Sequence, residues 1–328
     1  MKAIVYPEYG LVQFQEVAKP APKEDEVLIK VYAASINALD RHFLRGKPLL
    51  VRIMGGNGLR KPKDPRLGVD LAGRVEAVGR NVTQFKPGDE VFGRGRGAFA
   101  EYACARATAI VLKPPALTFE QAAAVPIAAL TALGALRDKA QVQPGQKVLI
   151  QGASGAVGTF AVQLAKAFGA EVTAVCSTQN VEQARALGAD HVINYTREDF
   201  TKNGQQYDVI LAVNGYHSIF AYRRALRPGG IYLMVGAATA RLIRSMLQTM
   251  ILGPLLTRIG DKRLGFFSAA PTPEHLAYLK ELLETGQLVP AVEKCYPLCE
   301  TAAAIRYMDA GHSRGKIVLT VDQATAAA

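Results

Sequence analysis

The sequence predicts an α/β protein of two domains, one small and rich in strands, the other with a parallel sheet between layers of helices. Three observations support this prediction. The chain has 328 residues, of which 49% are hydrophobic, so it can bury two cores. Residues 1–117 contain short strand-like runs separated by Gly and Pro. From residue 118 onward, strand-like and helix-like runs alternate.

The strand-rich part is predicted from β-branched and aromatic residues that gather in short runs between turn-forming residues. The expected strands are residues 2–6, 26–36, 68–79, 89–93, 98–105 and 109–113. We therefore expect a small β domain from this part of the chain.

The second part alternates between apolar strands and helices. Its expected strands are residues 147–153, 171–176, 191–195, 208–213 and 230–236, with helical patterns such as 158–169 and 218–230 between them. Continuous apolar strands joined through helices predict a doubly wound, Rossmann-type parallel sheet that is covered on both faces and has right-handed crossovers. Residues 264–269, LGFFSA, are its expected edge strand.

The last 40 residues return to a strand, helix, strand pattern. The expected elements are residues 291–298, 300–311 and 315–321. Because the parallel sheet already has an edge strand, we expect this segment to join the first domain. The predicted division is residues 1–117 with 289–328 in the strand-rich domain, and residues 118–288 in the Rossmann domain.

The net charge of +11 is unevenly distributed. Between residues 40 and 66 there are eight Lys and Arg residues against two acids, a local excess of +6. A solvated basic surface explains this excess most simply; attraction of a phosphate-bearing cofactor or acidic ligand, or contact with a membrane or nucleic acid, are alternatives. No aromatic residues alternate with these charges as a stacking platform requires, so specific nucleic-acid binding is not expected.

The sequence contains no pattern of a signal peptide or membrane span. MKAIVYPEYG lacks the apolar run of a signal peptide, so a cytoplasmic location is expected. The segment 241–260 is mostly apolar, but arginines stand at its start and Gly253-Pro254 interrupts its apolar run. Too few continuous apolar residues remain to cross a bilayer. A core or dimer-facing helix is favoured there over peripheral membrane contact. The four scattered cysteines are expected to be free buried thiols, not disulfides or metal ligands.

The stretch VLIQGASGAVG places glycines at a spacing of three between an expected strand and an expected helix. In that context Gly152 permits the tight turn, Gly155 lets backbone N–H groups approach a pyrophosphate, and Gly158 allows close helix–strand packing. The whole loop is predicted to bind a dinucleotide at the helix N-terminus: Gly152, Ala153, Ser154, Gly155, Ala156, Val157 and Gly158. A ligand-free glycine turn is the alternative.

The choice of nucleotide is predicted from the end of the second strand. NAD-preferring proteins place Asp or Glu there to bind the ribose 2′-hydroxyl, whereas this sequence reads Ser177, Thr178, Gln179, Asn180. Hydroxyls would accept a 2′-phosphate that a carboxylate would repel, and Arg185 and Tyr195 are plausible further donors. We therefore predict NADP(H). The alternative for Ser177 and Thr178 is a helix N-cap.

Motifs along essentially the whole chain resemble the medium-chain dehydrogenase/reductase superfamily, in particular its zinc-independent quinone oxidoreductase branch. The matching motifs occur in order: SINALD, LGVDLAGRVEAVG, VTQFKPGDEVFG, AFAEYA, AAAVPIAALTAL, VLIQGASGAVG, LGADHVINY, LRPGGIYLMVG and GHSRGKIVLTV. The resemblance implies a GroES-like substrate domain built from both chain ends, a Rossmann domain between them, a cleft at their junction and a homodimer. The sequence departs from the family pattern at residues 46–65.

The resemblance also implies site residues. Asn37 and Asp40 match cleft residues near the nicotinamide, although a helix cap explains them as well. Thr131 matches a Thr near the nicotinamide, and Gly236 a backbone position beside it; an ordinary helix Thr and a strand-ending Gly are the alternatives. Asp70 is expected to be structural. No histidine or other side chain is assigned as proton donor, and water could serve.

Zinc is not expected, because zinc-dependent relatives have Cys where this chain has Asn37 and His where it has Val69, and they carry a four-cysteine lobe that it lacks. Without a Lewis acid, a conjugated acceptor is the favoured substrate, since the charge left by hydride addition spreads over an enolate or phenolate. The predicted activity is NADPH-dependent reduction of quinones or α,β-unsaturated carbonyls. The alternatives are a zinc-independent NADP-dependent alcohol dehydrogenase and a low-turnover NADPH-binding regulatory or membrane-associated protein.

Overall fold

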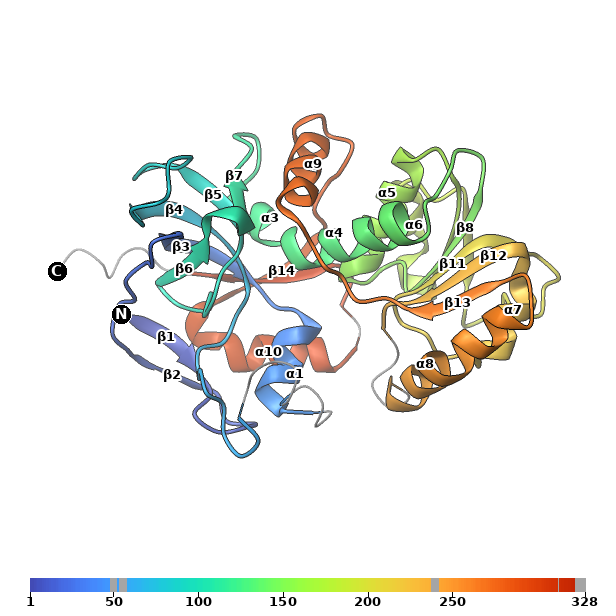
Figure 1. Cartoon of the computed structure of the whole chain (residues 1–328), viewed down its shortest axis with the longest axis horizontal. Coiled ribbons are helices and arrows are strands. Elements are labelled where there is room, and N and C mark those ends of the chain that lie inside the picture. Colours follow the sequence, from blue (N-terminus) through green and yellow to red (C-terminus); the bar gives the residue numbers. More distant parts are fainter. Residues whose placement is uncertain (48–51, 53–57, 237–241, 312, 322–328) are drawn as a thin grey trace. The chain divides into compact units, whose positions relative to one another are not determined.

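The computed structural model describes residues 1–47, 52, 58–236, 242–311 and 313–321. These form two compact units (Figure 1). Unit 1 comprises Met1–Ala128, Thr272–Thr285 and Pro290–Ala328, and unit 2 comprises Ala129–Pro271 and Gly286–Val289. Residues 118–128 and 272–285 thus lie with the strand-rich part, because α3 (Phe119–Ala123) contacts five strands of its sheet and α9 (Pro273–Glu284) contacts a sixth. The functional domain boundaries stay predictions.

Unit 1 is built around a seven-stranded sheet and a separate hairpin-like pair of strands. The pair is β1 (Lys2–Val5) with β2 (Gln13–Glu16), antiparallel. The sheet contains β3 (Glu26–Ser35), β4 (Asp70–Val78), β5 (Glu90–Arg94), β6 (Tyr102–Arg106), β7 (Ile110–Leu112), β14 (Val292–Pro297) and β15 (Lys316–Thr320). Its order is β14-β15-β3-β4-β5-β7, and β6 also pairs with β3.

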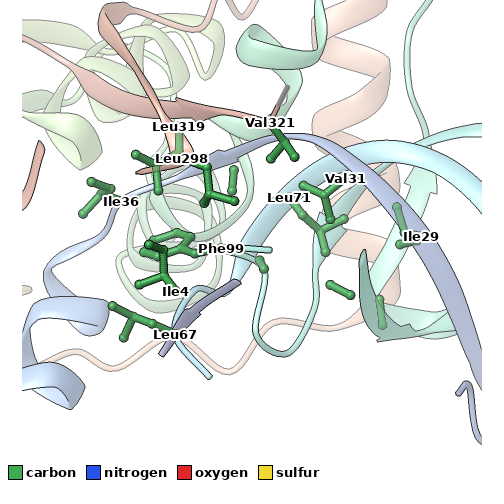
Figure 2. Close-up of a cluster of buried hydrophobic side chains, with 14 of the residues drawn as sticks. Ile4, Ile29, Val31, Ile36, Leu67, Leu71, Phe99, Leu298, Leu319 and Val321 are labelled. Atoms are coloured by element: carbon green, nitrogen blue, oxygen red, sulfur yellow. The ribbon is translucent and has the colours of Figure 1, made fainter. Parts of the chain in front are cut away.

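The C-terminal segment joins this sheet, as the sequence predicts. Strand β15 lies between β14 and β3: it pairs antiparallel with β3 through Val318 and Ser35, and parallel with β14. The helices of this unit are α1 (Ala38–Arg45), α3, α9 and α10 (Thr301–Asp309). Figure 2 shows Leu298 and Leu319 from the end of the chain beside Ile4, Ile36 and Phe99 in the apolar core.

Unit 2 contains a six-stranded sheet in which every neighbouring pair is parallel. The strands are β8 (Lys147–Gln151), β9 (Glu171–Cys176), β10 (His191–Asn194), β11 (Tyr207–Ala212), β12 (Leu226–Met234) and β13 (Arg263–Phe266). The order β10-β9-β8-β11-β12-β13 is that of the Rossmann fold, and β13 is the predicted edge strand. The predicted α/β class is confirmed.

Helices cover both faces of the parallel sheet. The helices of unit 2 are the part of α4 (Pro126–Leu133) from Ala129 onward, α5 (Ala156–Ala167), α6 (Val181–Ala186), α7 (Ile219–Ala225) and α8 (Leu242–Arg258). Within this unit α5 and α6 lie on one side of the sheet, and α7 and α8 on the other (Figure 1). The apolar strands are therefore buried on both faces, as continuous apolar runs require.

Three local predictions are wrong. The helix expected over 218–230 ends at Ala225, and β12 begins at Leu226, because Pro228 cannot continue a helix. Helix α8 is not interrupted at Gly253-Pro254. A proline removes the hydrogen bond to the carbonyl four residues earlier, that of Met250, but Met250 and Pro254 both lie on the exposed face, where water can replace it.

The third wrong prediction concerns the cysteines. All four are free thiols, but only Cys104 and Cys176 are buried, whereas Cys295 and Cys299 are exposed. Cys295 lies on β14, a strand at the edge of its sheet, whose alternation turns Tyr296 inward and Cys295 outward. In the described part of the chain no helix is long and apolar enough to cross a membrane.

Candidate functional site

The glycine loop lies between the end of β8 and the start of α5. Gly152 has φ +83°, in the left-handed region that side chains disfavour, and a Cβ there would lie 2.9 Å from the Cβ of Asn214. A Cβ on Gly158 would lie 2.1 Å from the backbone oxygen of Gly152. Both positions therefore require glycine so that α5 can lie directly against the loop.

Gly155 differs from the other two glycines, because the space beside it is open. It is the N-cap residue of α5, its φ of −79° suits any residue, and the nearest atom to a built Cβ is the Gly152 oxygen at 3.6 Å. Ser154, Ala156 and Val157 are partly exposed around it. The first turn of a helix leaves backbone N–H groups without intrahelical partners. The loop is therefore a cradle, open at the helix N-terminus, that fits the phosphates of a nucleotide.

At the carboxyl end of β9 a side chain that the sequence did not single out organises two serines. The buried Asn180 amide donates to Ser154 Oγ at 2.9 Å and to Ser177 Oγ at 3.1 Å. The structure thus brings Ser177 next to the glycine loop. Because each hydroxyl oxygen accepts from Asn180, its own O–H group is available to donate elsewhere. The signal in the sequence was a polar residue at the start of α6, which also reads as an ordinary cap.

The other residues predicted at this edge are differently engaged. The Thr178 hydroxyl accepts from Asn194 at 2.8 Å and lies 3.1 Å from the Thr196 hydroxyl. Tyr195 is 49% exposed and meets Tyr216 edge-on, with ring centroids 6.1 Å apart. Arg185 is exposed and pairs with Glu182 on its own helix. All three residues are exposed, but the Thr178 hydroxyl and the Arg185 guanidinium are engaged by these neighbours.

A buried hydrogen bond ties β8 to the loop that follows β11. Tyr222 Oη donates to Gln151 Oε1 at 2.5 Å and accepts from the backbone N–H of Tyr216 at 3.2 Å. The loop therefore stays close to the glycine turn. Sequence reasoning missed this pair, although a glutamine at the end of the apolar strand KVLIQ is a signal that could have found it.

Gly236 follows β12 and lies against the chain after β11. Its N–H donates to the Ala212 oxygen, its oxygen accepts from Gly215, and a Cβ there would lie 2.6 Å from the Val213 oxygen. This close approach is by itself a reason for glycine. Thr131 is partly exposed on α4. The predicted roles of Gly236 and Thr131 beside the nicotinamide stay predictions.

In unit 1, Asn37 and Asp40 belong to a buried polar cluster. Asn37 is the N-cap residue of α1, and its backbone N–H donates to Asp40 Oδ2 at 2.8 Å. Its side-chain Nδ2 donates to Asp70 Oδ2 at 2.9 Å, and its Oδ1 accepts from Lys316 Nζ at 2.7 Å. The capping alternative therefore describes the local geometry. The predicted catalytic role of Asn37 and Asp40 stays a prediction, although the Asp40 side chain is fully buried.

The charged centre of this cluster is the pair Asp70 and Lys316, both with no exposed surface. Lys316 Nζ lies 3.4 Å from Asp70 Oδ2, which also accepts from Ser35 Oγ at 3.1 Å. Asp70 Oδ1 accepts from the backbone N–H of Ile127 at 3.1 Å. Lys316 was missed, since a lysine that opens the apolar strand KIVLT looks like a surface residue.

Burial shifts the pKa values of these groups toward their neutral forms. Burial raises the pKa of Asp40 to about 7, with the nearby Asp70 adding to the effect and the Asn37 N–H opposing it. Burial also raises the pKa of Asp70 and lowers that of Lys316, while their mutual attraction opposes both shifts. Asp40 Oδ1 has no hydrogen-bond partner among the described residues, so the ionised form lacks a hydrogen bond that would stabilise it.

The positions where zinc-dependent relatives hold the metal do not fit zinc here. The Asn37 side chain forms hydrogen bonds with Asp70 and Lys316. The position at which those relatives have a histidine is Val69, which has no atom that binds a metal. Among the residues that the structure describes, no three His, Cys, Asp or Glu side chains are placed to hold a metal ion.

A Rossmann sheet with a phosphate cradle, and a second unit built from both ends of the chain, together define a dehydrogenase or reductase of the two-domain kind. Comparison with known families agrees. Residues 23–115 match the alcohol dehydrogenase GroES-like domain, and residues 187–319 match a model described as zinc-binding dehydrogenase.

Curated relatives and solved structures extend this match over nearly the whole chain. The NAD(P)H oxidoreductase RTN4IP1, mitochondrial, of Bos taurus is 34% identical, over 90% of this chain and 82% of the relative. The chloroplastic quinone-oxidoreductase QR1 of Triphysaria versicolor is 31% identical (97% and 98%), and the 2-methylene-furan-3-one reductase of Solanum lycopersicum 32% (97% and 79%).

Two solved structures have the same fold. The quinone oxidoreductase from Coxiella burnetii has a TM-score of 0.85 at 30% identity, covering 98% of this chain and 99% of the other. Mycobacterial Rv1454c complexed with NADPH has a TM-score of 0.84 at 25% identity, with 98% and 100% covered. The chain belongs to the medium-chain dehydrogenase/reductase superfamily, in its zinc-independent quinone oxidoreductase branch. It is an oxidoreductase of that family, and the predicted GroES-like domain is confirmed.

Proposed function

We propose that this protein is an NADPH-dependent reductase that transfers hydride to quinones or α,β-unsaturated carbonyls without zinc. The observation that carries the proposal is the edge of the parallel sheet where β8 and β9 end. There the Asn180 amide joins Ser154 of the glycine cradle to Ser177 at the end of β9, and this strand end carries no carboxylate.

The donors at this edge favour NADPH over NADH. Ser154 and Ser177 each accept a hydrogen bond from the Asn180 amide, so their O–H groups are available to donate to another acceptor. An anion such as a 2′-phosphate is stabilised by such donors, whereas a ribose 2′-hydroxyl in NAD-preferring proteins is held by a carboxylate. Tyr195 is a further exposed hydroxyl on the adjacent strand end. The nucleotide would thus lie along the loop from Gly152 to Gly158.

When bound, NADPH supplies a hydride from C4 of its nicotinamide. The chain itself first holds the cofactor. The cradle binds the pyrophosphate, and Gly236, which has no side chain, lets the backbone approach the nicotinamide. Thr131 is the proposed hydroxyl beside that ring. The acceptor is proposed to be conjugated because the residues at Asn37 and Val69 do not supply a metal site to stabilise an alkoxide. Solvent provides the proton.

The names of the relatives support this substrate class. One is called a quinone-oxidoreductase and another a 2-methylene-furan-3-one reductase, whose named substrate contains a conjugated carbonyl. We further propose a homodimer that forms through the edge strand β13, and a cytoplasmic location. Relatives with mitochondrial and chloroplastic names make the location a separate question to test.

The direct test measures oxidation of NADPH by the purified protein with a soluble quinone and, separately, with a simple enone. We expect turnover with at least one acceptor, insensitive to a chelator, and a lower KM for NADPH than for NADH. Oxidation with neither acceptor class would refute the proposal. Chelator-insensitive oxidation of simple alcohols with NADP would favour an alcohol dehydrogenase, and tight NADPH binding without turnover would favour a regulatory protein.

A matched pair of variants tests the cofactor preference. Ser177→Asp places a carboxylate at the end of β9 and should raise the KM for NADPH by about tenfold or more, with little effect on NADH. Gln146→Glu adds the same charge at the opposite edge of the sheet, where Gln146 Oε1 accepts from the Gln143 N–H and a carboxylate can do the same. Equal effects of the two variants would refute the assignment of Ser177.

A further inference from the structure

Helix α8 carries an apolar face that no described residue covers. Its inner face packs on the parallel sheet: Thr249 and Leu256 are buried, and Gly253 approaches β13 so closely that a Cβ would lie 2.7 Å from the Leu264 oxygen. This contact fixes the rotation of the helix about its axis. The opposite face must therefore point away from the sheet.

The outward face is apolar along its whole length. Its large exposed side chains recur at helical spacing and continue just past the helix end: Ile243, Leu247, Met250, Ile251, Leu255 and Ile259. Their exposed fractions range from 49% to 70%. Single exposed apolar residues are common, but a continuous stripe on one helix marks an interaction surface. We call these six residues the α8 stripe.

The charges around the α8 stripe are almost all positive. Four exposed arginines border it or lie on the elements beside it, Arg224, Arg244, Arg258 and Arg263, and none forms an ion pair with a described residue. Asp261 is the sole acid in the described residues from 218 to 271. Figure 1 shows α7 and β13, which carry Arg224 and Arg263, beside α8.

A second copy of the chain that pairs through the α8 stripe alone is a poor partner for this surface, and the homodimer proposed above forms through the edge strand β13 instead. A helix of 17 residues is about 25 Å long and about 10 Å wide, so the stripe offers about 250 Å². Stable dimers bury about 800 Å² on each partner. Pairing two α8 stripes would also bring the arginines of both copies together. An anionic surface that accepts an apolar helix face satisfies both the apolar stripe and the charges.

We propose that the α8 stripe binds this protein to the surface of membranes that contain anionic lipid, with the helix lying in the plane of the interface. The sequence favoured a core or dimer-facing helix for this segment, since it did not show which face would be exposed. The proposal concerns attachment to one leaflet, not a membrane span. It does not depend on the proposed reductase activity, although it would bring the protein close to quinones dissolved in lipid.

The test is co-sedimentation of the purified full-length protein with vesicles of phosphatidylcholine alone, and with vesicles of phosphatidylcholine and phosphatidylglycerol. We expect binding to the mixed vesicles that weakens as salt is added, and little binding to phosphatidylcholine alone. The double variant Ile251→Gln, Leu255→Gln should reduce the bound fraction by about tenfold or more. As a control, Leu11→Gln, Leu112→Gln removes two exposed apolar side chains from unit 1 and should change nothing.

A second pair of variants tests the charge requirement. Arg244→Gln, Arg258→Gln should reduce binding about fivefold or more at low salt, whereas Arg80→Gln, which removes an exposed charge from unit 1, should not. Circular dichroism and thermal unfolding are measured on every variant to show that each is folded. Absence of vesicle binding, or binding that survives the Ile251, Leu255 variant, would overturn the proposal. Self-association that this variant abolishes, without vesicle binding, would assign the stripe to a second copy.

Discussion

Replacing Lys316 with methionine should strongly destabilise unit 1. Methionine has nearly the length of lysine and no charge, so Lys316→Met removes the ammonium group with little change in volume. The ammonium lies 2.7 Å from Asn37 Oδ1 and 3.4 Å from Asp70 Oδ2, and it has no exposed surface. Its loss leaves Asp70 with only neutral donors.

The expected magnitude follows from the burial of both partners. Removing one member of a fully buried ion pair costs about 3–5 kcal/mol, because the remaining charge has lost its partner and cannot reach water. Asp70 keeps the hydroxyl of Ser35, the amide of Asn37 and the N–H of Ile127, which places the expected loss toward the lower end of this range. Protonation of Asp70 removes the uncompensated charge, so the loss should shrink as the pH falls.

The assay is urea-induced unfolding at neutral and acidic pH, followed by circular dichroism. Lys19→Met is the control, since Lys19 pairs with Glu76 at 2.7 Å but both side chains are about two-fifths exposed. An exposed pair contributes about 0.2–1 kcal/mol. The double variant Asp70→Asn, Lys316→Met should recover part of the loss, because it removes both charges.

The reasoning would be refuted if Lys316→Met cost no more than Lys19→Met, or if the double variant were as unstable as the sum of the two single ones. Either result would mean that the ammonium of Lys316 does not compensate the carboxylate of Asp70 in the folded protein.

The glycine loop and Asp40 give three more expectations. Gly158→Ala should lower the free energy of unfolding by about 1–3 kcal/mol, because its Cβ would lie 2.1 Å from the Gly152 oxygen. Gly155→Ala should leave stability within about 1 kcal/mol, since its Cβ has room, but weaken NADPH binding about tenfold or more by blocking the phosphates. Folding raises the pKa of Asp40 to about 7, so its stabilising contribution is complete below pH of about 4 and is lost as the pH rises through about 7. Asp40→Asn should remove this part of the pH dependence.

Unfolding curves and fluorescence titration with NADPH measure the glycine variants. Unchanged NADPH affinity in Gly155→Ala would contradict a phosphate cradle, and a stable Gly158→Ala would contradict the close contact of α5 with the loop. Unfolding of Asp40→Asn and of the unaltered protein between pH 4 and pH 8 measures the carboxyl. Parallel profiles would show that Asp40 titrates as an exposed group does.

Much of the fold could be predicted because burial on both faces leaves a clear pattern. The strands of the parallel sheet are continuous apolar runs, and Gly152 and Gly158 mark the turn at which α5 lies directly against the loop after β8. The pattern could not predict burial where apolar residues occur on every face of a helix. Helix α8 is apolar nearly all round, so nothing in its sequence separated buried Leu256 from exposed Leu255.

The site was predicted only in its local parts. Residues 152–158 and Ser177 stand in chain segments whose strand ends meet at one edge of a parallel sheet, so topology alone brings them together. Asn180 and the Asp70–Lys316 pair depend on contacts between segments distant in sequence. No periodicity reports such contacts, and a lysine next to IVLT gives no sign that the strand will be inserted between two others.

The position of β15 has a meaning for how the protein is made. The strand lies inside the sheet of unit 1, between β14 and β3, and it begins with the cation that Asp70 needs. A ribosome therefore releases β3 long before its neighbour β15 exists. Unit 2 is nearly continuous in the chain and can close during synthesis, whereas the sheet of unit 1 keeps an open edge at β3, and Asp70 lacks Lys316, until β14 and β15 are synthesised.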